Sequence, residues 1–443
     1  MQRRGILAYY TERPAQLLAT SFIITIAIGA LLLSLPLATK GDGSASIIDA
    51  IFTATSSVCV TGLIVKDTPV FFSNFGLVVI LVLIQLGGLG IMTISGAVAL
   101  AVRRGMAVKQ RAVMQQMMDQ SYYEELRHVL KRILEGTLLI EALGTIALTI
   151  AWHDPSRGML GTLWVSAFHS ISAFCNAGFS LFSDSLMGSQ GTPFVLIVHM
   201  ALIVIGGLGF TIIGPILGFK LPKGIHARLT VIVSVILVIS GFVFFLFVES
   251  TRGMLDQPLS TKMWNALFQS ISARTAGFNT VDLATWSDAS IVVTIILMFI
   301  GASPGSTGGG VKTTTLGILV LATISMVRGR REVEFHGRRI PQEIIIKATT
   351  ILLFSLALVY TFTIALMLTE SLPFKSLMFE VVSAFGTVGL SLGITADLSS
   401  IGKVLITMLM YLGRIGPLTA AMIVGERMVR ARFRYPEERV MVG

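Results

Sequence analysis

The sequence predicts an all-α polytopic membrane protein, built from four helix–loop–helix repeats with pseudo-fourfold symmetry around one central pore. Its composition, its pattern of long and short apolar segments and its internal repeats each point to this fold class. Of the 443 residues, 53% are hydrophobic and 13% are charged, whereas a soluble domain has about 25% charged residues. A soluble protein this apolar would expose large sticky patches, so the chain is expected to lie in a bilayer.

Eight apolar segments are long enough to span a membrane, whose core of about 30 Å requires about 20 helical residues. They are Leu17–Ala38, Phe75–Val102, Ile133–Trp152, Pro193–Phe219, Leu229–Val248, Ile291–Val327, Ile344–Leu368 and Val404–Val429. Within each successive pair lies a shorter apolar stretch, typical of a re-entrant segment: Ile47–Leu63, Leu163–Phe179, Trp264–Phe278 and Phe374–Leu390. Each repeat is therefore M1–P-loop–M2, giving eight transmembrane helices and four re-entrant pore helices.

The short stretches and the second helices each recur four times in the same order. The short stretches read FTATSSVCVTGL (52–63), FHSISAFCNAGF (168–179), FQSISARTAGF (268–278) and FEVVSAFGTVGL (379–390). The second helices contain LGGLGIMT (86–93), IGGLGFTI (205–212), IGASPGST (300–307) and LGRIGPLT (412–419). Recurrence of both motifs indicates internal repeats. We expect repeat 1 over 1–105, repeat 2 over 106–225, repeat 3 over 226–335 with a loop at 301–315, and repeat 4 with a C-terminal tail over 336–443.

Basic residues indicate the orientation. Most of the 34 lysines and arginines lie in five places: the N-terminus (Arg3, Arg4 and Arg13), the loops 103–132 and 220–228, the stretch 328–347, and the tail after Glu426. Cytoplasmic loops are enriched in Lys and Arg. Both termini are therefore expected in the cytoplasm, and the pore helices are expected to enter from outside.

Each short stretch ends in a glycine, which can adopt backbone angles closed to other residues. Four such stretches converging on one axis would present rings of carbonyl oxygens that replace the hydration shell of a cation, and the pore-helix C-termini favour positive charge. The stretches offer no carboxylate side chain, which argues against calcium or magnesium. For any single glycine, helix packing is the alternative. The predicted filter residues are Val58, Cys59, Val60, Thr61, Gly62, Cys175, Asn176, Ala177, Gly178, Arg274, Thr275, Ala276, Gly277, Gly386, Thr387, Val388 and Gly389.

The segment Ile291–Val327 is too long for one transmembrane helix. Its 37 residues (327 − 291 + 1) would form a helix of about 55 Å, against a bilayer core of about 30 Å. The motif GASPGSTGGGVKTTT (301–315) lies near its middle and predicts a break. Broken helices mark transport pathways, so we expect a movable loop below the filter. The motif misses the P-loop pattern by one residue, Val311, and no strand precedes it, which argues against a nucleotide-binding enzyme.

Two basic residues are expected at this loop, Lys312 and Arg414. Arg414 follows Gly389 by 25 residues (414 − 389), as Ala302 follows Gly277 (302 − 277), so repeat symmetry places Arg414 at the depth of the loop. Arg414 either closes the pore together with the loop or pins helices. Lys312 either obstructs the path, snorkels or pairs with an acidic group. The predicted gate residues are Gly301, Ser303, Gly305, Ser306, Thr307, Gly308, Gly309, Gly310, Lys312 and Arg414, with loop carbonyls and the hydroxyls of Ser303, Ser306 and Thr307 as acceptors for the arginine.

Four motifs carry a family resemblance: SARTAGFN (272–279), FIGASPGSTGGGVKTTT (299–315), SAFGTVGLSLG (383–393) and GRIGPLT (413–419). The chain resembles, over essentially its whole length, the Trk/Ktr/HKT superfamily of potassium transporters, and most of all the KtrB-type membrane subunits of bacterial Ktr systems. The resemblance implies a channel-like potassium-translocating subunit, not an enzyme. It also implies one filter glycine per repeat (Gly62, Gly178, Gly277 and Gly389), an intramembrane gating loop and a pore-lining Arg414. HKT proteins that favour sodium carry Ser at the first of these positions, so Gly62 is consistent with potassium.

The resemblance further implies partners and location. K⁺ is the expected transported ion, and a Na⁺/K⁺ symporter of the same superfamily is the alternative left open. No cofactor is expected in this chain, because ATP or ADP would bind a cytoplasmic ring of KtrA-type RCK regulatory subunits. The chain is expected to form a homodimer, with 434–443 near the interface. It would be a multi-pass protein of the bacterial inner (plasma) membrane, in contact with lipid and not with nucleic acid.

Overall fold

The computed structural model describes residues 14–41, 43–103, 120–153, 158–209, 212–213, 224–330 and 332–416. The N-terminal arginines, most of the basic loop 103–132, residues 220–223 and the tail 434–443 lie outside these residues. The described chain is mostly helical, as predicted. Its α-helices are α2 (Pro14–Leu33), α3 (Ile47–Val58), α4 (Thr68–Phe71), α5 (Asn74–Arg103), α7 (Gln120–Ala151), α8 (Gly158–Phe174), α9 (Pro193–Leu208), α11 (Ile225–Glu249), α12 (Leu259–Ser272), α13 (Asp288–Phe299), α14 (Thr313–Val327), α15 (Gln342–Thr369), α16 (Phe374–Gly386) and α17 (Ser400–Ile415). Short 3-10 helices are η1 (Pro36–Ala38), η2 (Met187–Ser189), η3 (Leu283–Thr285) and η4 (Thr395–Asp397).

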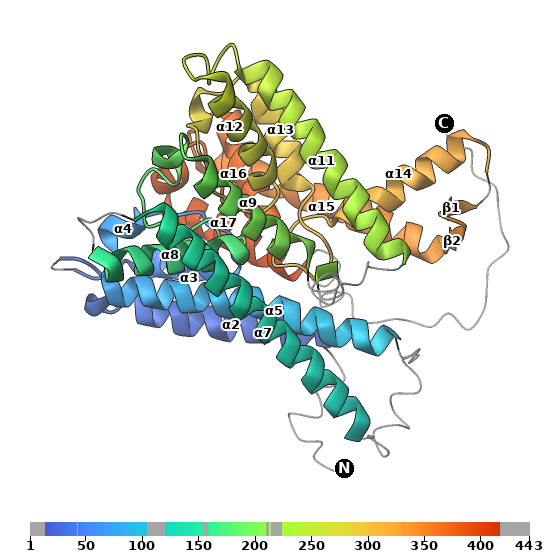
Figure 1. Ribbon diagram of the computed structural model, residues 1–443, viewed down its shortest axis with the longest axis horizontal. Helices are drawn as coiled ribbons and strands as arrows, with labels where there is room; N and C mark the ends of the chain where they lie inside the picture. The colour runs from blue at the N-terminus through green and yellow to red at the C-terminus, as the bar shows by residue number, and fades with distance from the viewer. Residues whose placement is uncertain are drawn as a thin grey trace.

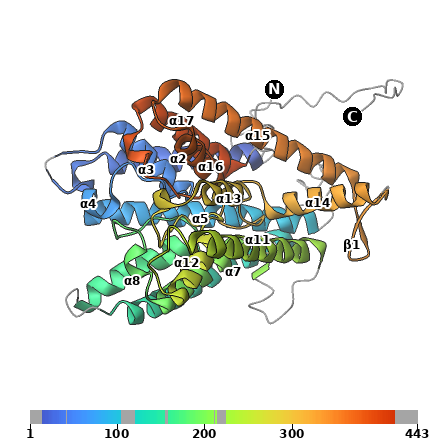
Figure 2. The ribbon, with the colours of Figure 1, turned by 90° about the horizontal axis from the view of Figure 1, so that it is seen from above.

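The helices form four groups, and in each group the second helix precedes one of the four aligned glycine segments. The groups are α2–α3–α5, α7–α8–α9, α11–α12–α13 with α14, and α15–α16–α17. Neighbouring groups touch through α5 and α7, α9 and α12, α13 and α16, and α17 and α3. The contacts therefore run around a closed circle. Figures 1 and 2 show the blue first group beside the orange-to-red fourth group, and the green second group beside the yellow third.

Two of the predicted spans are longer than the helices described within them. In Pro193–Phe219 the helix α9 ends at Leu208, and in Val404–Val429 the helix α17 ends at Ile415. Gly209 (φ 80°) and Gly416 (φ 91°) follow them directly, and a glycine in the left-handed conformation commonly ends a helix. Among the described residues, three helical stretches are long and apolar enough to cross a bilayer: 127–151 of α7, α11 and α15.

The break predicted within Ile291–Val327 is confirmed. Helix α13 ends at Phe299 and α14 begins at Thr313. Backbone hydrogen bonds close the base of the intervening loop, from Val311 N to Phe299 O (3.2 Å) and from Thr313 N to Ala302 O (3.4 Å). The helix break of the third group thus contains the motif at 300–307, and α9 and α17 end within the aligned motifs at 205–212 and 412–419. Helix α5 continues through the fourth copy, at 86–93.

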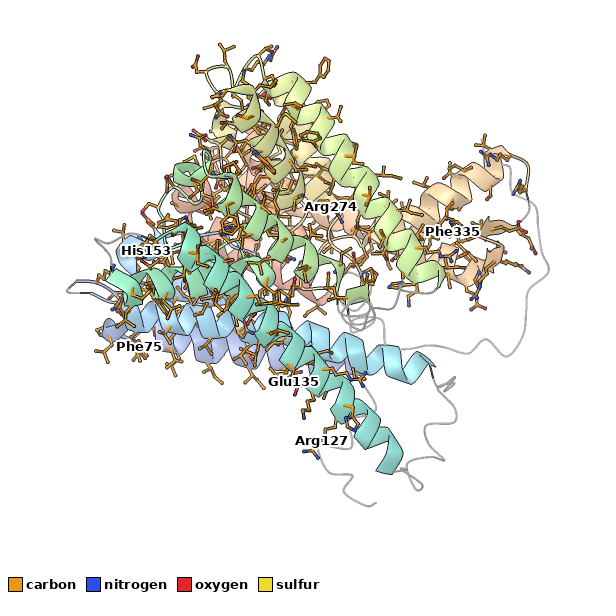
Figure 3. All side chains as sticks on the ribbon, viewed as in Figure 1. Phe75, Arg127, Glu135, His153, Arg274 and Phe335 are labelled. Carbon is orange, nitrogen blue, oxygen red and sulfur yellow. The ribbon has the colours of Figure 1, made fainter. Side chains whose placement is uncertain are left out.

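The all-α prediction is wrong at one place. Strands β1 (Val333–Phe335) and β2 (Arg338–Ile340) form an antiparallel hairpin between α14 and α15. Its turn residues, His336 (φ 48°) and Gly337 (φ 71°), both have positive φ, which matches the twist that a two-residue hairpin turn requires. Figure 3 shows Phe335 of this hairpin set apart from the side chains of the main body.

Much of the buried core lies in the second helix of each group, α3, α8, α12 and α16, and in the segment that follows it. Each aligned motif begins with a phenylalanine that is fully buried: Phe52, Phe168, Phe268 and Phe379. The residue that ends each motif is also buried: Leu63, Phe179, Phe278 and Leu390. Close packing at both ends holds the intervening segment in place. Helices α8 and α12 begin at Gly158 and Leu259, five residues before the predicted apolar stretches.

Polar contacts join neighbouring groups. Lys403 of α17 pairs with Asp49 of α3 at 2.9 Å. Lys375 of α16 pairs with Asp288 of α13 at 2.7 Å, and this hydrogen bond lowers the pKa of the Asp288 carboxyl. The second of these pairs is exposed and contributes little stability, whereas Lys403 and Asp49 are largely shielded from solvent.

Candidate functional site

The four glycines Gly62, Gly178, Gly277 and Gly389 form a closed ring. A methyl group on the Cα of any one of them would meet the backbone of the next segment around the ring. The carbonyl oxygens that it would meet are those of Ala177, Ala276, Val388 and Thr61, for the four glycines in the order given. All four glycines also have positive φ, at 92°, 69°, 80° and 92°. Conformation and space both require glycine here, and the four segments surround one axis.

The residue two positions before each ring glycine is left-handed as well. These residues are Val60 (φ 54°), Asn176 (φ 57°), Thr275 (φ 82°) and Thr387 (φ 49°). Positive φ is uncommon outside glycine and is an outlier for β-branched Val and Thr; such a residue costs about 1–3 kcal/mol. The four segments thus share one unusual backbone path.

A serine in each of the helices α3, α8, α12 and α16 fixes the segment that follows it. In the first and fourth groups the serine hydroxyl accepts a hydrogen bond from the N–H of the ring glycine. In the second and third groups the hydroxyl donates a hydrogen bond to the carbonyl of the residue after that glycine. The bonds join Ser56 Oγ to Gly62 N (3.1 Å), Ser383 Oγ to Gly389 N (3.1 Å), Ser172 Oγ to Phe179 O (2.7 Å) and Ser272 Oγ to Phe278 O. All four serines are fully buried. The aligned serines were visible in the sequence, but their partners were not.

We expect Ser56→Ala to lower the free energy of unfolding by about 1–3 kcal/mol, because it leaves the buried Gly62 N–H without its partner. Ser57→Ala is a matched control, since Ser57 Oγ donates to Thr53 O (2.7 Å) within α3. Thermal unfolding of the purified protein in detergent measures both. A midpoint for Ser56→Ala no lower than that of Ser57→Ala would contradict the role of this serine.

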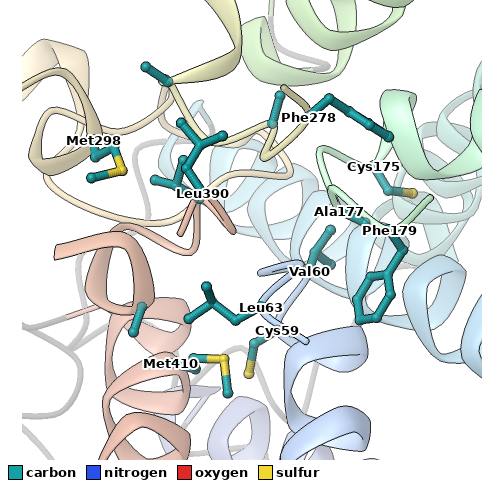
Figure 4. Packing of buried hydrophobic residues seen from close by; sticks show 14 of the residues in the cluster. Cys59, Val60, Leu63, Cys175, Ala177, Phe179, Phe278, Met298, Leu390 and Met410 are labelled. Atoms are coloured by element: carbon teal, nitrogen blue, oxygen red, sulfur yellow. The ribbon is translucent and has the colours of Figure 1, made fainter. Parts of the chain in front are cut away.

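Side chains three positions before the ring glycines contact the surrounding helices. Cys175 Sγ lies 3.7 Å from Gln85 Oε1 of α5. The Arg274 guanidinium donates to Ser234 O (3.3 Å) and Ser234 Oγ (3.2 Å) of α11, so Arg274 can offer the ring only its backbone. Figure 4 shows Cys59 beside Met410 and Cys175 on the far side of Ala177 and Val60. Both cysteines are free and buried.

One side of the ring opens into a cavity of about 260 Å³. The four ring glycines line it together with polar side chains of the loops that follow them, including Asp67, Asp184 and Asn279. A cavity with two carboxylates attracts cations. The ring glycines therefore share this cavity with two carboxylates.

Glu380 of α16 is a residue that sequence reasoning missed. It is fully buried and accepts hydrogen bonds from Ser391 Oγ (2.8 Å) and Thr395 Oγ1, two residues that line the cavity. Glu141 of α7 was missed too: it is buried and accepts from Gln85 Nε2 at 3.1 Å. An acidic residue inside an apolar segment was the available signal in both cases.

The opposite side of the ring is covered by the loop of residues 300–312. Its Gly308 and Gly309 lie so close to Thr275 and Thr387 that a Cβ on either glycine would meet those side chains. Its backbone also donates to the end of α9, from Ser303 N to Gly207 O (3.2 Å) and from Thr307 N to Gly206 O (3.4 Å). The loop is thus held against the second, third and fourth groups.

Arg414 joins this loop to the first group. Its Nη1 donates to Thr307 O, and its Nη2 donates to Gly87 O of α5 at 2.7 Å. The side chain is only 3% exposed. Within the described part of the chain its acceptors are these two carbonyls, and the hydroxyls of Ser303, Ser306 and Thr307 do not take that role.

Lys312 lies at the end of the loop, directly before α14. Its Nζ donates to the carbonyls of Gly308 and Gly309, the latter at 3.4 Å. The ammonium group thus binds the backbone of its own loop. The acidic partner considered from the sequence is not found among the residues that the structure describes.

A mostly helical chain with long apolar helices, in which four glycine segments meet in a ring, is a membrane protein. Comparison with known proteins gives the family. The TrkH family, described as cation transport proteins, matches residues 7–218 and 221–428. This chain belongs to that family.

Relatives match the chain from end to end. The Potassium/sodium uptake protein NtpJ of Enterococcus hirae is 38% identical over 442 residues, covering 97% of each chain. The Ktr system potassium uptake protein B of Bacillus subtilis is 37% identical over 449 residues, covering 100% of each. The crystal structure of the potassium transporter TrkH from Vibrio parahaemolyticus has a TM-score of 0.74 at 20% identity, covering 97% of this chain and 88% of that one. The last similarity shows that the fold is shared.

Proposed function

We propose that this chain is the potassium-translocating, channel-like transmembrane subunit of a K⁺ uptake system. The closed ring of four glycine segments carries the proposal, because equivalent backbone segments around one axis suit the replacement of a cation's hydration shell. Relatives named for potassium uptake support it. The four helix groups are then four repeats, with the boundaries 1–105, 106–225, 226–335 and 336–443.

In this proposal K⁺ enters through the cavity and is selected at the ring. Asp67 and Asp184 raise the local cation concentration, and the backbone carbonyls of the filter residues named above coordinate the ion. The absence of carboxylates among those residues favours a monovalent cation. The serine hydrogen bonds hold each segment against the helix that precedes it.

The loop 300–312 and Arg414 form the gate on the cytoplasmic side of the ring. The loop covers the exit from the ring, and the buried guanidinium of Arg414 repels a cation that approaches it. Lys312 holds the shape of the loop through its bonds to Gly308 and Gly309. For the gate to open, the loop must move away from Arg414, which breaks the hydrogen bond from Arg414 to Thr307 O.

We further propose a homodimer in the bacterial inner membrane, with both termini cytoplasmic and a KtrA-type RCK ring that binds ATP or ADP. Growth rescue tests the proposal as a whole. A bacterial strain lacking K⁺ uptake should grow at limiting K⁺ when it expresses this chain, and better with a co-expressed RCK subunit. If the strain fails to grow both with this chain alone and with the co-expressed RCK subunit, although the protein is present in the membrane, the function is ruled out.

A Na⁺/K⁺ symporter is the second candidate, favoured by one relative's name, Potassium/sodium uptake protein. K⁺ uptake into proteoliposomes with and without Na⁺ separates the two. A channel-like subunit conducts K⁺ without Na⁺. A symporter requires Na⁺ and accumulates it at a fixed ratio to K⁺.

A further inference from the structure

Two side chains of the ring segments reach down to the loop. Thr387 Oγ1 accepts a hydrogen bond from Gly309 N at 2.9 Å. The Asn176 side-chain amide lies 2.9 Å from Thr307 Oγ1. Asn176, Thr307 and Thr387 are fully buried, so water does not replace either bond while the loop is in place.

The amide of Asn176 is best satisfied with its oxygen toward Thr307. In that orientation the oxygen accepts from Thr307 Oγ1 (2.9 Å) and Gly207 N (3.1 Å), and the nitrogen donates to Ile203 O (3.3 Å). Asn176 therefore links the second ring segment to α9 and to the loop at once. Thr387 makes the corresponding link from the fourth segment.

Both residues occupy the left-handed position two residues before a ring glycine, Asn176 with φ 57° and Thr387 with φ 49°. Such a conformation persists only when its surroundings hold it, and it is least natural for β-branched Thr387. The loop supplies part of what holds it, through Gly309 N. Departure of the loop removes that support directly beneath Gly178 and Gly389.

We infer that Asn176 and Thr387 are positioning residues that tie the loop to the ring, so that the gate and the filter change together. This inference rests on the proposed function, in which the ring selects K⁺ and the loop closes the path. While the loop is in place, the side chains of Asn176 and Thr387 hold the loop, and the loop holds the backbone of these two residues. When the loop leaves, both ring segments lose a restraint, and the ring discriminates less between K⁺ and Na⁺.

Two substitutions test the coupling from opposite sides. Thr387→Val removes the acceptor for Gly309 N and keeps the side-chain shape. Thr307→Val removes the hydroxyl that meets Asn176, while the Thr307 carbonyl that Arg414 binds remains. Each should raise ⁸⁶Rb⁺ uptake into proteoliposomes about two- to tenfold, the worth of one hydrogen bond, and each should lower the K⁺/Na⁺ permeability ratio. Thr387→Ser keeps the acceptor and should restore most of the ratio.

Thr323→Val is the matched control, since Thr323 is exposed on α14 and bonds Leu319 O within that helix. It should leave flux and ratio unchanged. Higher uptake with an unchanged K⁺/Na⁺ ratio in both test variants would overturn the coupling, and unchanged uptake in both would overturn the tie itself. If Thr387→Val fails to fold, Thr307→Val decides alone, because Thr307 lies outside the ring. Failure of the proposed function looks different: removal of the loop would then leave flux unchanged.

Discussion

Deletion of Ser306–Gly309 should raise K⁺ flux into proteoliposomes by about 100-fold or more. The deleted residues carry the Thr307 carbonyl bound by Arg414, the Thr307 N–H bound by Gly206 O and the Gly309 N–H bound by Thr387. A hydrogen bond to a charged group contributes about 1.5–3 kcal/mol and a neutral one about 1 kcal/mol. Since about 1.4 kcal/mol is a factor of ten, losing them shifts the gate strongly toward open. Regulation by an RCK subunit should be lost as well.

A single substitution measures the contribution of Arg414 separately from that of the loop. Arg414→Ala removes the bonds to Thr307 O and Gly87 O and should give a smaller rise, about tenfold, because loop contacts with Gly206 and Thr387 remain. Arg328→Ala removes an equal charge from an exposed position after α14 and should have no effect. Wild-type flux and wild-type regulation after the deletion would remove residues 300–312 from the gate.

Replacement of Gly389 by alanine should reduce K⁺ flux about tenfold or more. The new methyl group would enter the space of Thr61 O and lie 3.0 Å from the Cα of Gly62, so the first or the fourth segment must move. Both belong to a ring held by buried serines, and ion coordination depends on the separation of its carbonyls. A loss of about 1.4 kcal/mol in ion stabilisation is enough for the tenfold effect.

Gly329→Ala is the matched control for backbone strain. Gly329 also has positive φ (68°), but a Cβ there would meet nothing within 4 Å. Both substitutions carry the cost of a left-handed alanine, about 1–3 kcal/mol, and only Gly389→Ala disturbs the ring. Equal transport by the two variants would show that Gly389 matters for backbone conformation alone.

Several main features followed from the sequence. The convergence of the four glycine segments was predictable because four aligned motifs must fold alike. The break between α13 and α14 was predictable because 37 residues exceed the length of one span. The placement of Arg414 beside the loop agrees with its offset from Gly389.

Other features depend on backbone angles and tertiary partners that one sequence does not reveal. Gly209 and Gly416 end α9 and α17, but a glycine in an apolar run looks the same whether its φ is positive or negative. The partners of Asn176 and Thr387 lie 131 and 78 residues away in the chain. The His336–Gly337 turn was overlooked because hydropathy does not score a two-residue hairpin.

The K⁺/Na⁺ permeability ratio of Gly62→Ser tests the central claim most directly. It is measured from reversal potentials or paired ion fluxes in proteoliposomes containing the purified chain. The serine side chain would enter the space of Ala177 O in the neighbouring second segment and should raise Na⁺ permeation relative to K⁺. A wild-type ratio in a folded Gly62→Ser protein would show that the ring of four glycines does not select the ion.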